Sequence, residues 1–429
     1  MPYKYKLIYY LYMTSLFMSA LGSYAIANVP LPWLSNVSFV VLSIWVLATS
    51  HKKMVPGVVL LSTFLLWATA ITLLNMVFKN YSIFIPQNAT TNYMFYVSLR
   101  LFNIIVFSAT LYLTYWICLV AESKKLIEDI LFIATIIGLY SIYVYIAQTN
   151  GLPEIPRNRL GTGGEEQSTT FSYAFHRAMG TFREPSHLAE WIVLPLILSF
   201  IYTDLKGRLR SFLLTIVMML TGSLTGISSL VLGIVTSNFM DLQGLVNRIN
   251  RNIKLIFIIG FSLVCFNLIV AGTSKSSHGL IETLWDRIEP IVEDDGLKSS
   301  NRNYVYEYSE QVSFPFLGAG LGHSNLLFTK YLDLNIVASF LNLYLNIGYS
   351  MGWIGLFILF LLFFLPIYLY YSNNNIQNKS YVMLLFSAYF SWLVIFYVHA
   401  EELSIIFSVT FGILLYELKK STRLIAHEK

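Results

Sequence analysis

Charged residues are scarce in this sequence of 429 residues. Lys, Arg, Asp and Glu together make up 12% of the chain, about half the share of roughly 25% that is usual in soluble domains. Hydrophobic residues make up 56%. This composition excludes an ordinary soluble globular domain, and it predicts a polytopic membrane protein, because about 20 consecutive apolar residues are enough to cross a bilayer.

Cysteine is rare as well. The two cysteines, Cys118 and Cys265, both fall in apolar runs, so the sequence contains neither a disulfide framework nor a cysteine-based metal site. The apolar runs are continuous and lack the alternation of apolar and polar residues that is typical of barrel strands. We therefore predict an all-α polytopic membrane protein with a single membrane domain over 1–429.

About twelve apolar segments are long enough to be considered as membrane crossings. Residues 211–239 form either one long helix or two short helices that meet near Gly222 and Ser223. The segments lie near 7–27, 31–49, 55–77, 93–121, 126–147, 186–203, 211–222, 224–239, 253–271, 335–371, 380–398 and 403–418.

The formal net charge is +5, but the basic residues are dispersed in twos and threes between apolar runs. This distribution argues against a nucleic-acid partner and for orientation in a membrane, where positive loops face the cytoplasm. With this rule, both termini are expected in the cytoplasm, and residues 211–239 are expected to be two helices. Two long loops, 148–185 and 272–334, are then external, and we expect any active site to lie in them.

The first loop ends in a dense cluster of polar residues. Arg177, Arg183, Glu184 and His187 lie within a dozen residues, directly before an apolar helix. Pro185 is explained by structure alone, because proline is favourable in the first turn of a helix. Structure alone does not explain the charged residues, because burying a charge at a membrane surface is costly unless the charge is paired or serves a function. They are therefore candidates for a functional site.

The second loop contains Arg302, Tyr304 and Tyr306, followed by a glycine run at 318–322. On a helix Arg302 and Tyr306 share a face. Arginine can bind diphosphate oxygens with two parallel hydrogen bonds, and aromatic rings stack on sugars. The glycine run lacks the Lys-Ser/Thr ending of a phosphate loop, so a tight turn is its expected role.

Three further features have two possible interpretations. Arg100 lies within an apolar segment, where it either serves a function or extends its charge to the membrane surface. The acidic run at 293–295 either binds a cation or forms a solvated turn. The residues at 399–402 are either part of a site or only a polar loop.

These features together resemble the bacterial O-antigen polymerase and ligase superfamily of integral membrane glycosyltransferases, over residues from about 170 to 372. The resemblance depends on GTFREPSHLA at 180–189, LTGSLTG at 220–226, Arg302 upstream of PFLGAG at 315–320, and NLYL at 342–345 followed by GWIG at 352–355. Two positions depart from the family pattern. Ligases of the family have a histidine at the position of Leu341. Many members have an arginine in the short helix where this chain has Ser223, Leu224 and Thr225.

The resemblance implies transfer of a glycan from one undecaprenyl diphosphate to a hydroxyl group of a second lipid-linked repeat unit, at the outer face of the bacterial plasma (inner) membrane. It implies a polymerase of O-antigen, capsular or exopolysaccharide, because Leu341 replaces the ligase histidine. No metal or cofactor is expected without an Asp-x-Asp pair. The expected partners are the lipid-linked donor and acceptor, membrane lipids and a chain-length regulator protein.

The implied roles divide among three groups of residues. The diphosphate ligands are Arg177, Arg183, Arg302 and Arg100; the base is Glu184 or His187; the sugar-binding residues are Tyr304 and Tyr306. The alternatives are an O-antigen ligase of the same superfamily and a twelve-helix transporter or flippase of lipid-linked glycans. Carriers with two homologous halves show internal symmetry, and this sequence has none that we detect.

Overall fold

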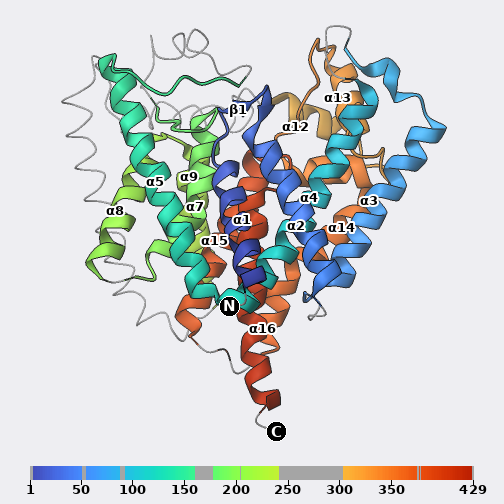
Figure 1. The fold of residues 1–429 in the computed structure, drawn as a ribbon. Helices are drawn as coiled ribbons and strands as arrows, with labels where there is room; N and C mark the ends of the chain where they lie inside the picture. The colour runs from blue at the N-terminus through green and yellow to red at the C-terminus, as the bar shows by residue number, and fades with distance from the viewer. Residues whose placement is uncertain are drawn as a thin grey trace. The chain divides into compact units, whose positions relative to one another are not determined.

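The computed structural model describes residues 3–50, 55–86, 92–159, 177–202, 204–240, 303–373, 376 and 378–427. Nearly all regular structure in this part of the chain is helical. Its two short strands, β1 (Ala25–Ile26) and β2 (Val29–Pro30), form an antiparallel hairpin. The helices are α1 (Tyr3–Ser19), α2 (Leu31–Thr49), α3 (Val58–Phe78), η1 (Tyr81–Phe84), α4 (Tyr93–Ala121), α5 (Ser123–Asn150), α7 (Pro185–Ser199), α8 (Leu205–Leu220), α9 (Leu224–Phe239), α12 (Asn303–Gln311), α13 (His323–Leu332), α14 (Leu343–Tyr371), α15 (Lys379–Val398) and α16 (Ile405–His427) (Figure 1).

Within the described residues, six helices are long and apolar enough to cross a membrane: α2, α3, α4, α5, α14 and α15. These helices are consistent with an all-α membrane protein, as the composition predicts. Helices α7, α8 and α9 have 15, 16 and 16 residues, which is shorter than the roughly 20 residues that a perpendicular crossing needs. The count of twelve crossings stays a prediction, and its segment 253–271 lies outside the described residues.

Two of the expected segments have different boundaries in the structure. The prediction of an apolar helix over 7–27 is wrong at its C-terminal end, because α1 ends at Ser19 and a β-hairpin follows. The two residues at the tip of this hairpin, Ala27 and Asn28, both have positive φ angles, as a type I′ turn requires. The segment expected over 335–371 begins later, at Leu343, where the Asn342 side chain accepts a hydrogen bond from the Leu345 N–H at 3.0 Å.

Residues 211–239 form two helices, as the charge pattern favours, and not one. Helix α8 ends at Leu220 and α9 begins at Leu224. Between them Gly222 adopts a φ of +51°, which glycine accepts without steric cost. The Ser223 hydroxyl then accepts a hydrogen bond from the Gly226 N–H at 3.2 Å and caps α9.

The chain forms two compact units. The first unit comprises Met1–Leu42, Trp116–Glu289 and Asn378–Ile395; the second comprises Ser43–Tyr115, Pro290–Gln377 and Phe396–Lys429. Helices α2, α4 and α15 pass from one unit to the other. The single membrane domain over 1–429 remains a prediction.

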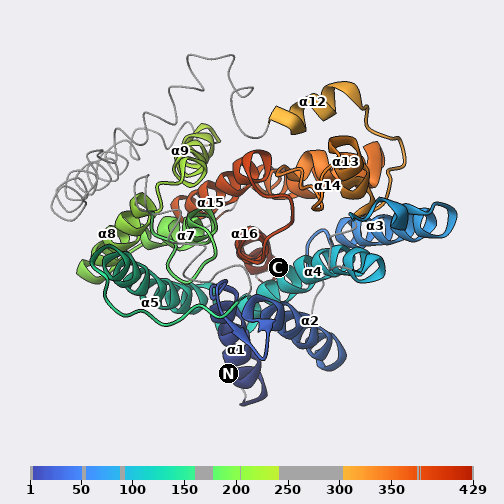
Figure 2. The same cartoon turned by 90° about the horizontal axis from the view of Figure 1, so that it is seen from above.

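The core of the first unit is the packing of α5, α7 and α8 against one another, with α9 on α7 (Figures 1 and 2). Helix α9 also meets the first part of α15. There the Ser237 and Ser387 hydroxyls lie 2.6 Å apart, and a Cβ on Gly233 would be 2.2 Å from the Ser391 Oγ. Because the residue order reverses between these two contacts, α9 and α15 run antiparallel at close range.

In the second unit α14 packs against α3 and α16, and α13 packs against η1 and α14. An aromatic cluster lies between α12, α13 and the start of α14. Its buried members are Val305, Tyr308, Phe328, Ala338, Phe340 and Tyr349. Phe328 and Phe340 stack with their ring centroids 4.6 Å apart. This cluster fixes α12 to the rest of the unit.

Candidate functional site

In the first unit, residues 177–184 form a turn that leads into α7. Arg177 lies at its start, where its Nε donates a hydrogen bond to the Thr221 carbonyl at 2.7 Å. The Ala178 N–H donates to the Leu220 carbonyl at 2.8 Å, so side chain and backbone both bind the turn between α8 and α9. Gly222 lies against the Arg177 side chain, with 3.5 Å between an added Cβ and the arginine Nε.

The middle of this turn is held tightly on other sides. Gly180 has a φ of +51°, and an added Cβ would lie 2.0 Å from the Ser141 Oγ of α5. Thr181 donates from its hydroxyl to the Ala20 carbonyl, and its own carbonyl accepts from the Ser23 N–H at 2.9 Å. The first residues of the 180–189 motif therefore fix the backbone, which places the charged residues that follow.

Two further arginines reach the same turn from residues 157–159. Arg157 donates from Nη2 to the Gly180 carbonyl at 3.1 Å, and Arg159 donates from Nη1 to the Gly22 carbonyl at 2.7 Å. The Arg157 side chain is only 3% exposed. Its Nε and Nη1 are buried and have no hydrogen-bond partner in the described part of the chain.

Arg183, Glu184 and His187 follow at the start of α7. Arg183 and Glu184 are exposed and His187 is half-buried. Glu184 occupies the N-cap position, and its carboxylate accepts from the Ser186 hydroxyl at 3.3 Å. Pro185 is the first helical residue, as predicted. A carboxylate at this position complements the helix dipole.

The charges of this region are mostly positive. Arg183 lies close enough to Arg159 for its charge to lower the pKa of Arg159, which burial lowers more. Burial also lowers the pKa of Arg157, although Glu154, 3.9 Å away, acts in the opposite direction. Arginine stays protonated at neutral pH in spite of such shifts. The turn therefore concentrates positive charge, and an anion would be attracted to it.

Arg100 is in the second unit, in different surroundings. Its guanidinium forms an ion pair with Glu402, lies 3.7 Å from the Glu401 carboxylate and donates to the Tyr96 hydroxyl at 3.1 Å. Asn103, one turn further along α4, donates its amide to the same Glu402. Arg100 is therefore paired within the protein and does not extend freely to the membrane surface.

Glu401 is the buried centre of this second group, and its side chain is 8% exposed. Its carboxylate accepts hydrogen bonds from Asn325 and Ser339, and its carbonyl accepts from Asn346 at 3.1 Å. Burial raises the pKa of Glu401, while the positive charge of Arg100 opposes the rise. The residues at 399–402 are thus more than a polar loop, because they connect α4, α13 and the start of α14.

The tyrosines expected to bind sugar are on α12. Tyr304 packs against the aromatic cluster, with its ring centroid 5.8 Å from that of Phe328. Tyr306 is half-buried and lies two residues further along the helix, so it points in a different direction. Packing explains Tyr304 without a ligand. Arg302 lies outside the described residues.

The glycine run at 318–322 is a turn, as predicted. Gly318, Gly320 and Gly322 all have positive φ angles. Gly318 meets Gly352, where α14 is kinked, so closely that a Cβ on either glycine would come within 2.7 Å of the backbone of the other. The Leu321 N–H donates to the Thr72 hydroxyl at 2.9 Å. The run therefore fixes the backbone between α12 and α13.

The sequence analysis gave no role to Arg157 or Arg159, and it left open whether Glu401, within 399–402, belongs to a site. Arg157 and Arg159 were visible only as positive charge in a loop expected to be external. Glu401 could have been found by asking which carboxylate neutralises Arg100, because an isolated charge in an apolar segment is costly.

Comparison with known proteins gives no relative: no family model matches the chain, and no curated protein matches it significantly. Among the described residues, no group of three or more His, Cys, Asp or Glu side chains is arranged to hold a metal ion.

Proposed function

We propose that this protein is an integral membrane glycosyltransferase that polymerises undecaprenyl-diphosphate-linked repeat units into O-antigen, capsular or exopolysaccharide. The motifs at 180–189, 220–226, 315–320 and 342–355 support this function through their resemblance to the polymerase and ligase superfamily. The observation that carries it is the arginine-rich turn of the first unit. Arg177 of this turn and the neighbouring Arg157 and Arg159 donate hydrogen bonds to backbone carbonyls, and this positive charge would attract a diphosphate.

In this reaction a hydroxyl group of the acceptor sugar attacks the anomeric carbon of the donor. The bond between that carbon and the diphosphate oxygen breaks, and the lipid diphosphate leaves with the electron pair. Arg177, Arg183 and Arg302 would stabilise the negative charge on the leaving group. Glu184 or His187, at the start of α7, would take the proton from the hydroxyl.

We further propose twelve crossings, with both termini in the cytoplasm and the loops 148–185 and 272–334 outside the bacterial plasma membrane. The support is the alternation of basic loops. In a variant without Cys118 and Cys265, a cysteine at position 168 or 300 should react with an impermeant thiol reagent in intact spheroplasts. Reaction only after permeabilisation would reverse this orientation.

The decisive experiment is reconstitution of the purified chain in liposomes with labelled lipid-linked repeat units. We expect longer chains that are still attached to the lipid diphosphate. Transfer of preformed polymer to a final acceptor, without chain growth, would make the protein a ligase. Movement of the labelled lipid across the bilayer without any change in its glycan would make it a carrier.

A further inference from the structure

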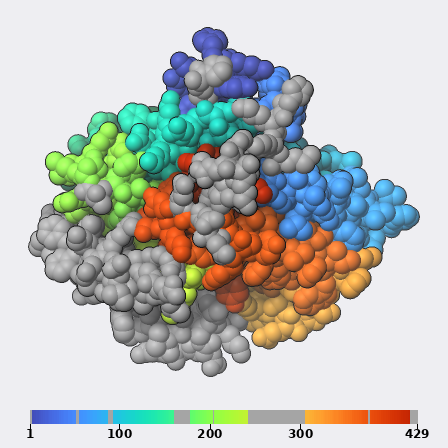
Figure 3. Space-filling view, turned by 90° about the horizontal axis from the view of Figure 1, so that it is seen from below, coloured from blue at the N-terminus to red at the C-terminus, as the bar shows by residue number. Residues whose placement is uncertain are grey.

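The first unit has a cavity far from the arginine-rich turn. It lies between the beginning of α5 and the segment that joins α7 to α8, and it encloses about 350 Å³, within the size range of small-molecule sites. Figure 3, from below, shows residues of α5 and α8 on one face of this unit. The turn contacts α5 at Ser141, and the cavity lies at Glu128, about 20 Å away along the helix at 1.5 Å per residue.

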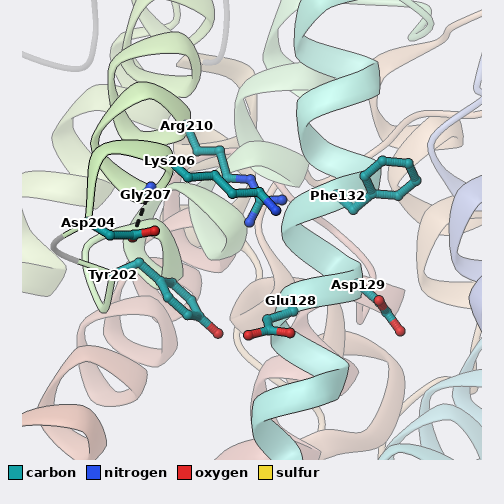
Figure 4. A pocket seen from close by; sticks show the side chains of 8 residues that line it. All are labelled: Glu128, Asp129, Phe132, Tyr202, Asp204, Lys206, Gly207 and Arg210. Carbon is teal, nitrogen blue, oxygen red and sulfur yellow. Dashed lines mark hydrogen bonds between the residues drawn. The ribbon is translucent and has the colours of Figure 1, made fainter.

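One wall of the cavity is basic. Lys206 and Arg210 are four residues apart on α8 and therefore share a face. Figure 4 shows both side chains extending from α8 towards α5, with their nitrogen atoms close together. Neither forms an ion pair or a hydrogen bond with a carboxylate in the described part of the chain. Two adjacent unpaired cations are well suited to bind one phosphate group.

Two carboxylates also line the cavity, Glu128 from α5 and Asp204 from the start of α8. Glu128 points from α5 towards Tyr202, while Asp129 turns away (Figure 4) and accepts a hydrogen bond from Tyr9. Asp204, at the N-cap of α8, accepts from the Gly207 N–H at 3.2 Å. Glu128 and Asp204 thus balance the two cations. A ligand with both a phosphate and a cationic group would match this arrangement better than a purely anionic one.

The lining of the cavity includes one exposed apolar side chain. Phe132 lines the cavity one turn beyond Glu128, and its side chain is 58% exposed. Helix α5 is a candidate membrane span that begins at Ser123. The cavity is therefore at the end of a span, at the level where lipid head groups meet water.

We propose that this cavity binds a phosphate ester that carries a primary ammonium group, as in the head group of an ethanolamine phospholipid. Lys206 and Arg210 bind the phosphate, Glu128 and Asp204 bind the ammonium group, and the lipid chains run along Phe132. The Tyr202 hydroxyl lines the cavity and can donate a hydrogen bond to the phosphate. This site is separate from the proposed catalytic turn and does not depend on the proposed function.

The test uses the full chain, purified in detergent and freed of lipid, with binding of dioleoyl phosphatidylethanolamine, phosphatidylglycerol and phosphatidylcholine measured by native mass spectrometry. Two exposed carboxylates can pair with the ammonium group, so the ethanolamine lipid should bind about five- to tenfold more tightly than the glycerol lipid. The double variant Lys206→Gln/Arg210→Gln should lose about tenfold in affinity. Arg208→Gln removes one charge from the same helix outside the cavity and should bind normally.

Glu128→Gln tests the binding of the ammonium group separately from the binding of the phosphate. This variant should reduce the preference for the ethanolamine lipid over the glycerol lipid to about twofold or less, because it removes a partner of the ammonium group. Thermal unfolding of each variant without lipid shows whether it is folded. Soluble O-phosphoethanolamine identifies the source of the ligand: if it displaces the lipid at equal concentration, the ligand is a soluble metabolite, and if it does not, the ligand is a lipid.

Two results would overturn the proposal. One is equal binding of the ethanolamine and glycerol lipids by the unchanged chain. The other is a double variant, folded by thermal unfolding, that binds as Arg208→Gln does.

Discussion

The arginines of the first unit and Arg100 of the second unit satisfy their hydrogen bonds in opposite ways. Arg157, Arg159 and Arg177 donate to backbone carbonyls. Arg100 pairs with Glu402 and lies near Glu401. A carbonyl satisfies a donor but leaves the positive charge in place, whereas a carboxylate cancels it.

This difference sets what an anionic ligand would have to displace at each arginine. Two unit charges 4 Å apart interact with about 4 kcal/mol at an effective dielectric constant of 20. An anion that competes for Arg100 must displace carboxylates that already make this interaction. At Arg157 the nearby carboxylate is that of Glu154, at 3.9 Å, so an anion that approaches Arg157 competes with one long ion pair. The sequence cannot show this distinction, because Glu402, the carboxylate partner of Arg100, lies 302 residues further along the chain.

The largest effect should follow from Arg177→Ala. Removing one donor that stabilises a developing negative charge typically costs about 10²- to 10³-fold in rate, and we expect chain growth in liposomes to fall by this factor. Arg177→Lys should restore little, because lysine has no planar pair of donors. The measurement is the rate of elongation of labelled lipid-linked repeat units, with Arg208→Ala as the control. Near-normal elongation by folded Arg177→Ala would remove this residue from the site.

In the second unit, Arg100→Ala should lower the free energy of unfolding, with little effect on the rate of elongation per folded molecule. Removing one partner of a buried pair leaves the other charge unpaired and costs about 3 to 5 kcal/mol. Because the Glu402 side chain is 39% exposed, we expect a smaller loss of about 2 to 3 kcal/mol in the free energy of unfolding.

A double-mutant cycle measures this pairing directly. Arg100→Met with Glu402→Gln should regain part of the stability that Arg100→Met loses alone. Thermal unfolding in detergent gives the stabilities, and elongation per folded molecule gives the activity. If Arg100→Ala unfolds like the unchanged protein but loses elongation, Arg100 belongs with the diphosphate ligands, as the sequence analysis expected.

The sequence predicted the local structure of several turns and helix ends, but it did not predict contacts between residues that are far apart along the chain. Pro185 at the start of α7, the turn at 318–322 and the break between α8 and α9 follow from the backbone preferences of proline and glycine, which act over a few residues. Ser141, which meets Gly180, is 39 residues away along the chain, and Arg100, which lies near Glu401, is 301 residues away. No period or motif encodes such a contact, so the sequence analysis singled out Arg100 and the residues at 399–402 separately but did not predict that they pair.

The raised pKa of Glu401 should make the free energy of unfolding depend on pH. Because burial raises its pKa, the folded protein binds this proton more readily than the unfolded chain does. The free energy of unfolding should therefore increase as the pH falls from neutral towards the ordinary pKa of a glutamate, by an amount on the order of 1 kcal/mol. Glu401→Gln should remove this part of the pH dependence in thermal unfolding between pH 7 and pH 5. An unchanged pH profile would show that Glu401 is ionised in both states.

The smallest effect should follow from Arg183→Gln, which tests whether exposed positive charge at the turn attracts the donor from a distance. Arg183 is exposed, and no hydrogen bond to it is found among the described residues, so its loss should change the free energy of unfolding by less than about 0.5 kcal/mol. Its charge adds to that of Arg159, and long-range attraction of this kind is screened by salt over about 8 Å at physiological ionic strength. We therefore expect the concentration of lipid-linked donor that gives half-maximal elongation to rise about two- to fourfold at low salt, and to match that of the unchanged protein at high salt. Arg183→Lys keeps the charge and should behave normally, whereas a defect that persists at high salt would show that the Arg183 guanidinium contacts the diphosphate directly.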